Sequence, residues 1–259
     1  MTVPVSPVLY WGGVAGMALG IAVIGGFLRS SRREDVSHGV LHLAVCAVGL
    51  FAYYSLVVDR TAIHLGDRVF YLSHYLYWIL TQPLLFVGIA LVALPPLSNP
   101  GDRRLRASLF GGLAGAAAAW ISGALFQAWA RTSGERWAWF ALSGAGLAAL
   151  LWQLWFPVRH QGDIKGGEHV RDFKILATLL TALALAYQVV WLLGDPGLKY
   201  WSTTTDIWAF LVLDLLSDVG LGVLSLALIE RLSKHVPAEP GETSVAAAAR
   251  LAQDARLER

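Results

Sequence analysis

Two aspartates lie four residues apart inside the last long apolar run of the chain, in the stretch FLVLDLLSDVGLGVL (residues 210–224). On a helix, Asp214 and Asp218 are one turn apart and therefore share a face. A carboxylate in hydrocarbon is strongly unfavourable unless it is paired or hydrated, so these two acids need partners. Two neighbouring carboxyl groups in a low dielectric cannot both ionise cheaply, and at least one is expected to hold a proton.

Polar side chains in other apolar runs have spacings that could bring them to these acids. In SHYLYWILTQPLL, His74, Tyr77 and Thr81 recur at i, i+3 and i+7, which places them in one stripe on a helix. The simplest assembly turns such faces toward a common interior pocket, with the acids on one wall and phenols and a histidine opposite. Further polar and aromatic residues of these runs are Tyr53, Trp78, Gln82, Tyr187, Gln188 and Trp191.

The buried acids have two interpretations. In the structural one, one or both are protonated and hydrogen-bonded to tyrosine or glutamine, and they hold helices together. In the functional one, they belong to a site, because ionisable groups inside a membrane segment commonly do. The spacing alone leaves both open.

The composition is that of an integral membrane protein. Hydrophobic residues make up 56% of the 259 residues, charged residues only 15%, and the mean hydropathy is +0.56. The formal net charge of +2 is too small to suggest a nucleic-acid partner. A single cysteine, Cys46, excludes an internal disulfide.

The apolar residues form seven runs that are long enough to cross a bilayer as helices. The runs cover approximately residues 8–28, 39–58, 70–94, 107–130, 137–156, 173–193 and 206–229. Short polar connections between them predict one all-α seven-helix transmembrane domain over residues 1–232. Residues 233–259 are expected to form a polar tail.

The positive charges predict the orientation in the membrane. The connections after the first, third and fifth runs, together with the tail, carry 15 of the 20 Lys and Arg residues. Positive charge is enriched on the cytoplasmic side, so the N-terminus is expected outside and the C-terminus in the cytoplasm.

Seven helices in this orientation, together with the sequences of three of them, resemble the microbial (type 1) rhodopsins. The segments are YLYWILTQPLL in the third helix, YQVVWLLG in the sixth and FLVLDLLSDVGLGVL in the seventh. That family has Arg, then an acidic counter-ion followed by Trp, and a Thr–Pro step in its third helix. Its sixth helix carries Tyr-Pro-x-x-Trp, and its seventh Leu-Asp-x-x-x-Lys-x-Gly. The resemblance covers about residues 8–232 and retains Tyr53, Trp78, Thr81, Pro83, Tyr187, Trp191 and Asp214.

The chain departs from the family pattern at the position that carries the cofactor. Asp218 stands where the resemblance implies the lysine that forms the retinal Schiff base. A Schiff base needs a primary amine, which a carboxylate cannot supply. The chain has four lysines, all in loops, the tail or a helix end: Lys165, Lys174, Lys199 and Lys234. We therefore expect no covalent retinal, and non-covalent retinal or a carotenoid as the alternative.

Other departures from the family pattern agree with the loss of the Schiff-base lysine. Tyr77 occupies the position of the acidic counter-ion and His74 that of the arginine, while Gly88 stands where pumps keep a cytoplasmic proton donor. Gln188 replaces the proline of the sixth helix, and Ala184 replaces the tryptophan that covers the polyene. The residues expected to line the pocket are Tyr53, His74, Tyr77, Trp78, Thr81, Gln82, Trp139, Phe140, Ala184, Tyr187, Gln188, Trp191, Asp214 and Asp218.

Three functional hypotheses follow. The first is a rhodopsin-like membrane protein that does not pump and acts as a sensor, an accessory protein or a non-covalent binder of an apolar ligand such as retinal or a carotenoid. The second is proton or cation passage along Tyr77, His74, Asp214 and Asp218. The third, an enzyme or divalent metal site built from His74 and the two aspartates, needs these side chains to meet across helices; otherwise the protein is not expected to be an enzyme.

The remaining expectations concern the surroundings of the protein. The chain is predicted to be a multi-pass protein of a prokaryotic cell membrane, in contact with the lipid bilayer. Related bundles often form trimers or pentamers, so a homo-oligomer is expected, and the sequence identifies no signalling partner.

Overall fold

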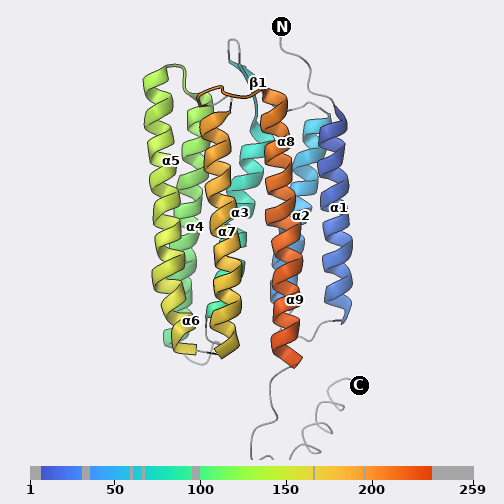
Figure 1. Cartoon of the computed structure of the whole chain (residues 1–259), viewed down its shortest axis with the longest axis vertical. Coiled ribbons are helices and arrows are strands. Elements are labelled where there is room, and N and C mark those ends of the chain that lie inside the picture. The colour runs from blue at the N-terminus through green and yellow to red at the C-terminus, as the bar shows by residue number, and fades with distance from the viewer. Residues whose placement is uncertain are drawn as a thin grey trace, which may run out of the picture.

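Long helical rods stand side by side in a computed structural model of the chain (Figure 1). The structure describes residues 7–30, 36–58, 61–65, 68–94, 100–165, 167–194 and 197–234. Within these residues, seven helices are long and apolar enough to cross a membrane, which confirms the predicted number of spans. The first rod begins and the last rod ends at opposite ends of the bundle (Figure 1). We refer to these as the N-terminal and the C-terminal end of the bundle.

Five of the seven rods are single helices, and the other two contain a π-helical turn. The first four are α1 (Pro7–Ser30), α2 (Val36–Val57), α3 (Leu72–Ala93) and α4 (Pro100–Trp129). The fifth rod is α5 (Ser133–Gln153), η1 (Leu154–Val158) and α6 (Arg159–Lys165), and the sixth is α7 (Gly167–Leu193). The seventh is α8 (Thr203–Asp214), the π-helical η2 (Leu215–Gly220) and α9 (Leu221–Lys234).

The helices differ from the predicted runs mainly at their ends. The fourth helix begins at Pro100 instead of residue 107, and the fifth rod continues to Lys165 instead of stopping at 156. Hydropathy marks only the part of a helix that lies in hydrocarbon, whereas the backbone hydrogen bonds continue into the polar flanks. The predicted tail, residues 233–259, lies almost wholly outside the described residues.

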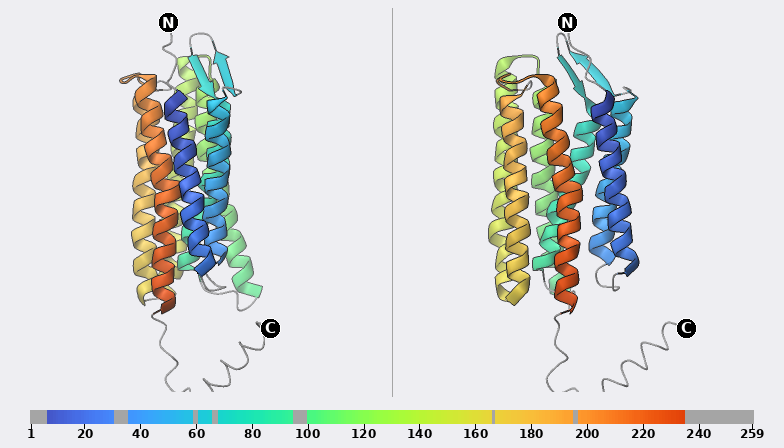
Figure 2. Two further views of the ribbon diagram at one scale, coloured as in Figure 1. Left: turned by 90° about the vertical axis from the view of Figure 1, so that its right-hand side faces the viewer. Right: turned by 45° about the vertical axis from the view of Figure 1, so that its right-hand side comes forward.

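A β-hairpin between α2 and α3 was not predicted. Strands β1 (Ala62–Leu65) and β2 (Arg68–Tyr71) pair antiparallel, with Ala62 opposite Tyr71 and Leu65 opposite Arg68. Figure 2 shows the two strands projecting beyond the helices at the N-terminal end of the bundle. Because β2 takes up residues 68–71, the third helix begins at Leu72 and not at residue 70.

Close helix contacts fix the fourth and fifth rods against each other. A Cβ atom added at Gly146 would lie 2.6 Å from the Trp120 backbone nitrogen, and one added at Gly123 would lie 2.8 Å from the Ser143 Cα. The Ser143 hydroxyl donates to the Trp120 carbonyl at 2.9 Å. Small residues therefore bring the two backbones together, as is common between membrane helices.

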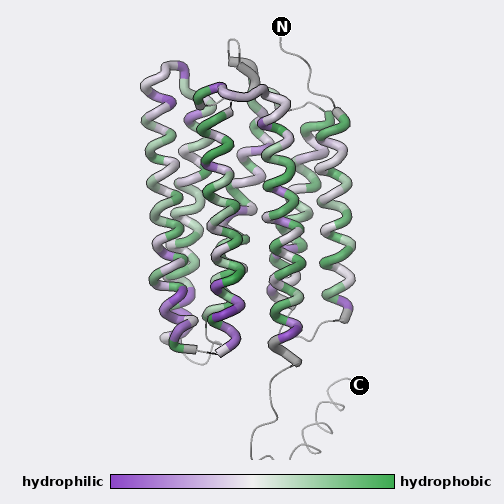
Figure 3. The backbone as a smooth tube through the Cα atoms, in the orientation of Figure 1, coloured by the Kyte–Doolittle hydropathy of each residue, from purple (hydrophilic) through white to green (hydrophobic). Residues whose placement is uncertain are grey.

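Apolar side chains cover both the interior and the exterior of the bundle. Large exposed side chains such as Phe51, Trp152, Phe156 and Leu216 point outward from the second, fifth and seventh rods. Figure 3 shows hydrophobic residues along the length of the rods and hydrophilic ones gathered near the C-terminal end. This exterior suits contact with lipid, where backbone polar groups must be satisfied inside each helix.

Candidate functional site

Asp214 lies at the centre of the bundle and accepts hydrogen bonds on both carboxylate oxygens. Oδ1 accepts from the Trp78 indole nitrogen at 2.8 Å and from the Tyr187 hydroxyl at 2.5 Å. Oδ2 accepts from the Tyr53 hydroxyl at 2.6 Å and lies 3.0 Å from the His74 Nε2 atom. The Asp214 side chain is fully buried, so these groups replace the water that a carboxylate would otherwise bind. Each of these four groups is able to donate a hydrogen bond to a carboxylate oxygen.

The donors come from three rods that pack around the seventh. Tyr53 belongs to α2, His74 and Trp78 belong to α3, and Tyr187 belongs to α7. The His74 ring stacks on the Trp78 indole with a centroid distance of 4.2 Å, which holds both rings toward Asp214. A protonated His74 would balance the charge of Asp214 and would donate from Nε2.

Asp218 is also fully buried, one turn further along, within the π-helical turn η2. Its Oδ2 atom accepts a hydrogen bond from the Tyr77 hydroxyl, and its Oδ1 atom accepts from the Ser217 hydroxyl at 3.0 Å. The backbone oxygen of Asp218 lies 3.8 Å from the Cys46 sulfur on α2. Wide π-turns of this kind often occur where a helix presents functional side chains.

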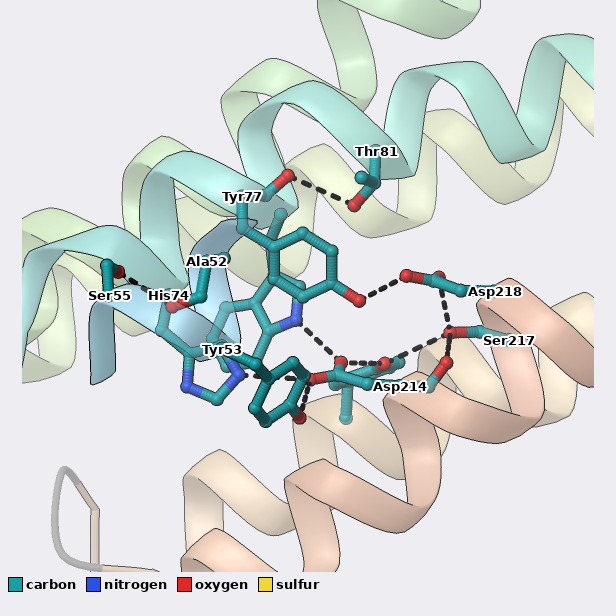
Figure 4. A network of polar contacts seen from close by, with 11 residues as sticks. Ala52, Tyr53, Ser55, His74, Tyr77, Thr81, Asp214, Ser217 and Asp218 are labelled. Carbon is teal, nitrogen blue, oxygen red and sulfur yellow. Dashed lines mark hydrogen bonds and ion pairs between the residues drawn. The ribbon is translucent and has the colours of Figure 1, made fainter. Parts of the chain in front are cut away.

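Ser217 joins the two aspartates into one network. Its hydroxyl lies 3.2 Å from the Tyr187 hydroxyl and 3.2 Å from the Asp214 carbonyl oxygen, in addition to its contact with Asp218. We define the aspartate network as Tyr53, His74, Tyr77, Trp78, Tyr187, Asp214, Ser217 and Asp218. Figure 4 shows Asp218, Ser217 and Asp214 along one helix, with Tyr77, Tyr53 and His74 facing them.

The aspartate network contains more acceptors than hydrogens around Ser217. The serine hydroxyl has one hydrogen but three oxygens within 3.2 Å, on Asp218, Asp214 and Tyr187. A proton on the Asp218 Oδ1 atom would donate to the Ser217 oxygen and free the serine hydrogen for one of the other two. With a proton at Asp218, every contact of Ser217 could therefore be a hydrogen bond.

Several predicted site residues lie next to the aspartate network without joining it. The Thr81 hydroxyl donates to the Tyr77 carbonyl at 3.0 Å, and Gln82 is buried beside it on α3. Gln188 accepts a hydrogen bond from the Trp120 indole at 3.0 Å and so links α7 to α4. Trp191 lies against Trp78, with ring centroids 5.4 Å apart, and Ala184 is buried in the same core cluster.

Two predicted pocket residues are placed elsewhere. The Trp139 ring packs against Phe126 of α4 with a centroid distance of 4.8 Å, and the Phe140 ring packs against Trp137 at 5.7 Å. The structure does not bring either of them to the aspartate network. The residues of α5 that turn inward are Ser143, Gly146, Leu147 and Leu150, and Trp139 and Phe140 precede them near the start of the helix.

The predicted metal ligands do not form a metal site. His74 contacts Asp214, whereas the Asp218 carboxylate is bonded to Tyr77 and Ser217. Among the residues that the structure describes, no group of three or more His, Cys, Asp or Glu side chains could hold a metal ion. The hypothesis of a metal or enzyme site at these residues therefore gains no support.

A second buried polar pair, which the sequence interpretation missed, lies nearer the C-terminal end. His42 of α2 and Ser225 of α9 are both buried, with 2.8 Å between Nε2 and the hydroxyl oxygen. The Ser225 hydroxyl also lies 2.9 Å from the Gly222 carbonyl, to which it donates, so the His42 Nε2–H is the natural donor to Ser225. The His42 Nδ1 atom is buried and has no hydrogen-bond partner within the described residues.

Glycines make the room that His42 occupies. A Cβ atom added at Gly222 would lie 3.3 Å from the histidine ring, and one added at Gly88 would lie 3.8 Å from it. The only signal in the sequence was a histidine inside an apolar run, because Ser225 is 183 residues away. Gly88, noted from the sequence as the missing proton donor, thus borders a different titratable side chain.

The sequence model of a family described as bacteriorhodopsin-like protein matches residues 5–232 of this chain. The chain belongs to the bacteriorhodopsin-like family. The bacteriorhodopsin of Haloterrigena sp. (strain arg-4) is 29% identical over 245 residues, which cover 90% of this chain and 92% of that protein. Sensory rhodopsin-2 of Natronomonas pharaonis is 25% identical over 218 residues, which cover 84% of this chain and 87% of that protein.

Solved structures of bacteriorhodopsin-like proteins have the same fold. The thermophilic rhodopsin from Rubrobacter xylanophilus superposes with a TM-score of 0.81 at 27% identity, covering 88% of this chain and 97% of that one. The light-driven proton pump of Coccomyxa subellipsoidea gives a TM-score of 0.77 at 25% identity, covering 88% of this chain and 98% of that one. The predicted family, the seven-helix membrane fold and a multi-pass membrane location in a prokaryote are confirmed.

The proteins similar to this chain thus include a light-driven proton pump and a sensory rhodopsin. None of the four lysines of this chain belongs to the aspartate network. Lys174, in the first turns of α7, lies 3.7 Å from Asp163, and Lys199 lies in the connection between α7 and α8. Lys165 and Lys234 are the last residues of α6 and α9.

Proposed function

We propose that this bacteriorhodopsin-like protein forms no retinal Schiff base, does not pump ions with light, and acts as a membrane sensor or accessory protein that binds an apolar ligand non-covalently. The observation that carries the proposal is the Asp218 side chain. It is fully buried and hydrogen-bonded to Tyr77 and Ser217. The family resemblance assigns this position to the Schiff-base lysine.

The residues present do not fit a covalently bound retinal. Attachment requires a primary amine that reaches the centre of the bundle, and a carboxylate is no substitute. Lys174 is paired with Asp163 at the C-terminal end of the bundle, and the other lysines lie at helix ends or in a connection. No step of the proposed function therefore passes through a Schiff base.

The charges around Asp218 support the same conclusion. A cationic Schiff base needs a nearby anion, and the resemblance assigns that role to position 77. Tyr77 is neutral and donates its hydroxyl hydrogen to Asp218. Asp214 already has four hydrogen-bonding partners, so the aspartate network is balanced by its own phenols, indole and imidazole.

Aromatic side chains line the interior of the bundle beside Asp214. The Phe210 ring contacts those of Trp78, Tyr187 and Trp191, with centroid distances between 5.0 and 6.2 Å. Flat apolar ligands bind well among such rings, and a few polar groups fix their orientation. Ala184, where the resemblance implies a tryptophan, is buried in the same core cluster.

An absorption spectrum of purified protein with and without added all-trans-retinal tests the proposal. The wild type should show no visible band that survives washing and disappears with hydroxylamine. Asp218→Lys combined with Tyr77→Asp should gain such a band, because it supplies both the amine and the anion. Asp218→Asn is the matched control and should stay colourless. A hydroxylamine-sensitive pigment in the wild type would refute the proposal.

A second candidate function, proton passage, is favoured by the His42–Ser225 pair. His42 and Cys46 are one turn apart on α2, and the Cys46 sulfur lies 3.8 Å from the Asp218 backbone oxygen. The pair therefore supplies a titratable group between Asp218 and the C-terminal end of the bundle, which the charge distribution assigns to the cytoplasm. Histidines and buried acids are the usual parts of proton relays.

Proton flux into liposomes, followed with an enclosed pH-sensitive dye, tests this second function. If protons pass along this path, Asp218→Asn and His42→Gln should each reduce the flux at least several-fold. Gly144→Ala on α5, where an added Cβ atom meets nothing within 4 Å, is a control that should leave the flux unchanged. Equal flux in all four proteins would remove both residues from any path.

A further inference from the structure

A groove opens toward the membrane between α2 and α3, separate from the interior around Asp214. It encloses about 610 Å³, within the range of roughly 300–1,000 Å³ that small-molecule sites occupy. Its walls carry large apolar side chains that no other part of the described chain covers. Phe51 is 75% exposed and Tyr54 51% on the α2 side, and Leu76 and Leu80 face them from α3.

One end of the groove is polar. The Thr61 and Ser73 hydroxyl oxygens lie 2.8 Å apart, and the Ser55 hydroxyl donates to the Ala52 carbonyl at 2.7 Å. Thr61 and Ser73 have two hydroxyl hydrogens but share a single hydrogen bond, so one hydrogen remains to be donated. The groove therefore offers a hydrogen-bond donor to a carbonyl or hydroxyl oxygen of an occupant.

The inner wall of the groove belongs to the aspartate network. Tyr77 lines the groove although only 2% of the residue is exposed, and its hydroxyl donates to Asp218 on the other side. In Figure 4, Ala52 and Ser55 of α2 lie on the same side of Asp214 as His74 and Tyr77. A molecule in the groove would touch the tyrosine ring that holds Asp218.

We propose that this groove binds a flat, lipid-soluble molecule with a polyene or isoprenoid body and a single oxygen at one end, which enters from the bilayer. The rings of Phe51, Tyr54 and Tyr77 match a flat conjugated body, and the Thr61–Ser73 pair matches the terminal oxygen. The inference rests on the proposed function in that it names a binding site for a non-covalent apolar ligand. A plain acyl chain would use neither the aromatic walls nor the hydroxyl pair.

All-trans-retinol is the probe for the test, because an alcohol cannot form a Schiff base with any lysine. Full-length protein in phospholipid nanodiscs is titrated with retinol, and retinol fluorescence is compared with that in empty nanodiscs. Leu76→Trp fills the groove, and Leu142→Trp is its matched control, since the two leucines are 48% and 50% exposed on different rods. Thr61→Val with Ser73→Ala removes the polar end, and Ala184→Trp fills the interior instead.

Saturable binding above the level of empty nanodiscs is expected for the wild type. Leu76→Trp should weaken it at least ten-fold, and the Thr61→Val, Ser73→Ala protein about five-fold, as expected for one lost hydrogen bond. Leu142→Trp should bind within two-fold of the wild type. Leu80→Trp fills the same groove from the next turn and replaces Leu76→Trp if that variant does not fold.

The possible outcomes distinguish a failure of the groove proposal from a failure of the proposed function. If retinol binding is lost in Ala184→Trp but not in Leu76→Trp, the groove proposal is wrong and the ligand site lies in the interior. Equal partitioning of retinol into empty nanodiscs would refute the groove proposal. Displacement of bound retinol by added phospholipid would refute it as well. The proposed function would fail separately, through a hydroxylamine-sensitive pigment formed by the wild type with retinal.

Discussion

Replacing Tyr53 by phenylalanine removes one donor from the Asp214 carboxylate and leaves the ring in place. The lost bond is 2.6 Å long, fully buried and directed at a carboxylate, so it belongs to the stronger hydrogen bonds in proteins. Bonds to charged groups stabilise a fold by about 1.5–3 kcal/mol. Tyr53→Phe should therefore lower the free energy of unfolding by about 1.5–3 kcal/mol.

Asp214→Asn is the more severe change. An asparagine keeps one acceptor oxygen but turns an NH₂ group toward two of the present donors. Each donor left without an acceptor costs about 1–3 kcal/mol, which gives a loss of about 2–6 kcal/mol. In the Tyr53→Phe, Asp214→Asn double variant, the Tyr53 hydroxyl is absent and cannot be left without an acceptor. The double variant should therefore lose less stability than the sum of the two single variants. The two changes should therefore be non-additive, with an interaction energy of about 1.5–3 kcal/mol.

The assay is unfolding in mixed detergent micelles with increasing sodium dodecyl sulfate, followed by tryptophan fluorescence. Tyr200→Phe is the control, because Tyr200 is 76% exposed and should change the stability by no more than about 0.5 kcal/mol. If Tyr53→Phe is as stable as Tyr200→Phe, or if the losses add, Asp214 does not anchor the helices as described.

Two further predictions use the same unfolding assay. Gly146→Ala should destabilise the protein by about 1–3 kcal/mol, because the new methyl group would lie 2.6 Å from the Trp120 nitrogen. Gly144→Ala meets nothing within 4 Å and should be neutral or slightly stabilising, so equal effects at both glycines would contradict the close approach of α4 and α5. Ser225→Ala should cost about 1–3 kcal/mol by leaving the His42 Nε2 atom unpaired, and Ser225→Thr should restore most of the loss. Equal stability of these two variants would show that the hydroxyl has no part in holding His42.

The number and order of the helices could be predicted from the sequence because they depend on local properties. A run of about 20 apolar residues is sufficient to define a spanning helix, whatever it packs against. The ends were less predictable: Pro100 and Lys165 lie in polar flanks where hydropathy has no boundary. The β-hairpin at residues 62–71 was missed because its strands are only four residues each, too short for a periodic pattern.

The aspartate network was largely predictable because its members repeat at helical spacing. His74, Tyr77 and Thr81 share one face of α3, and Asp214 and Asp218 share one face of the seventh rod. Ser217, which joins the two acids, was not anticipated, since a serine in an apolar run is common and neutral. Its role depends on the distances to Tyr187 and Asp218, which only the packing of helices determines.

Other residues could not be placed from the sequence for the same reason. Trp139 and Phe140 lie in the fifth run, but the rotation of α5 about its axis decides whether they reach the centre, and it turns Ser143 and Gly146 inward. The partly buried ion pair between Asp172 and Arg231, with distances of 2.8 and 3.1 Å, joins residues 59 positions apart at the edges of two predicted runs. Contacts between distant segments leave no periodic trace in a single sequence.

The π-helical turn at Leu215–Gly220 has a consequence for how the seventh rod can bend. A π-helical turn lacks the regular hydrogen-bond pattern of the α-helices on either side, so a helix bends most easily there. Asp214 lies just before the turn and is held by side chains of three other helices, whereas Asp218 lies within it and is held by Tyr77 and Ser217. Bending at η2 would therefore stretch the bond between Tyr77 and Asp218 and leave Asp214 in place.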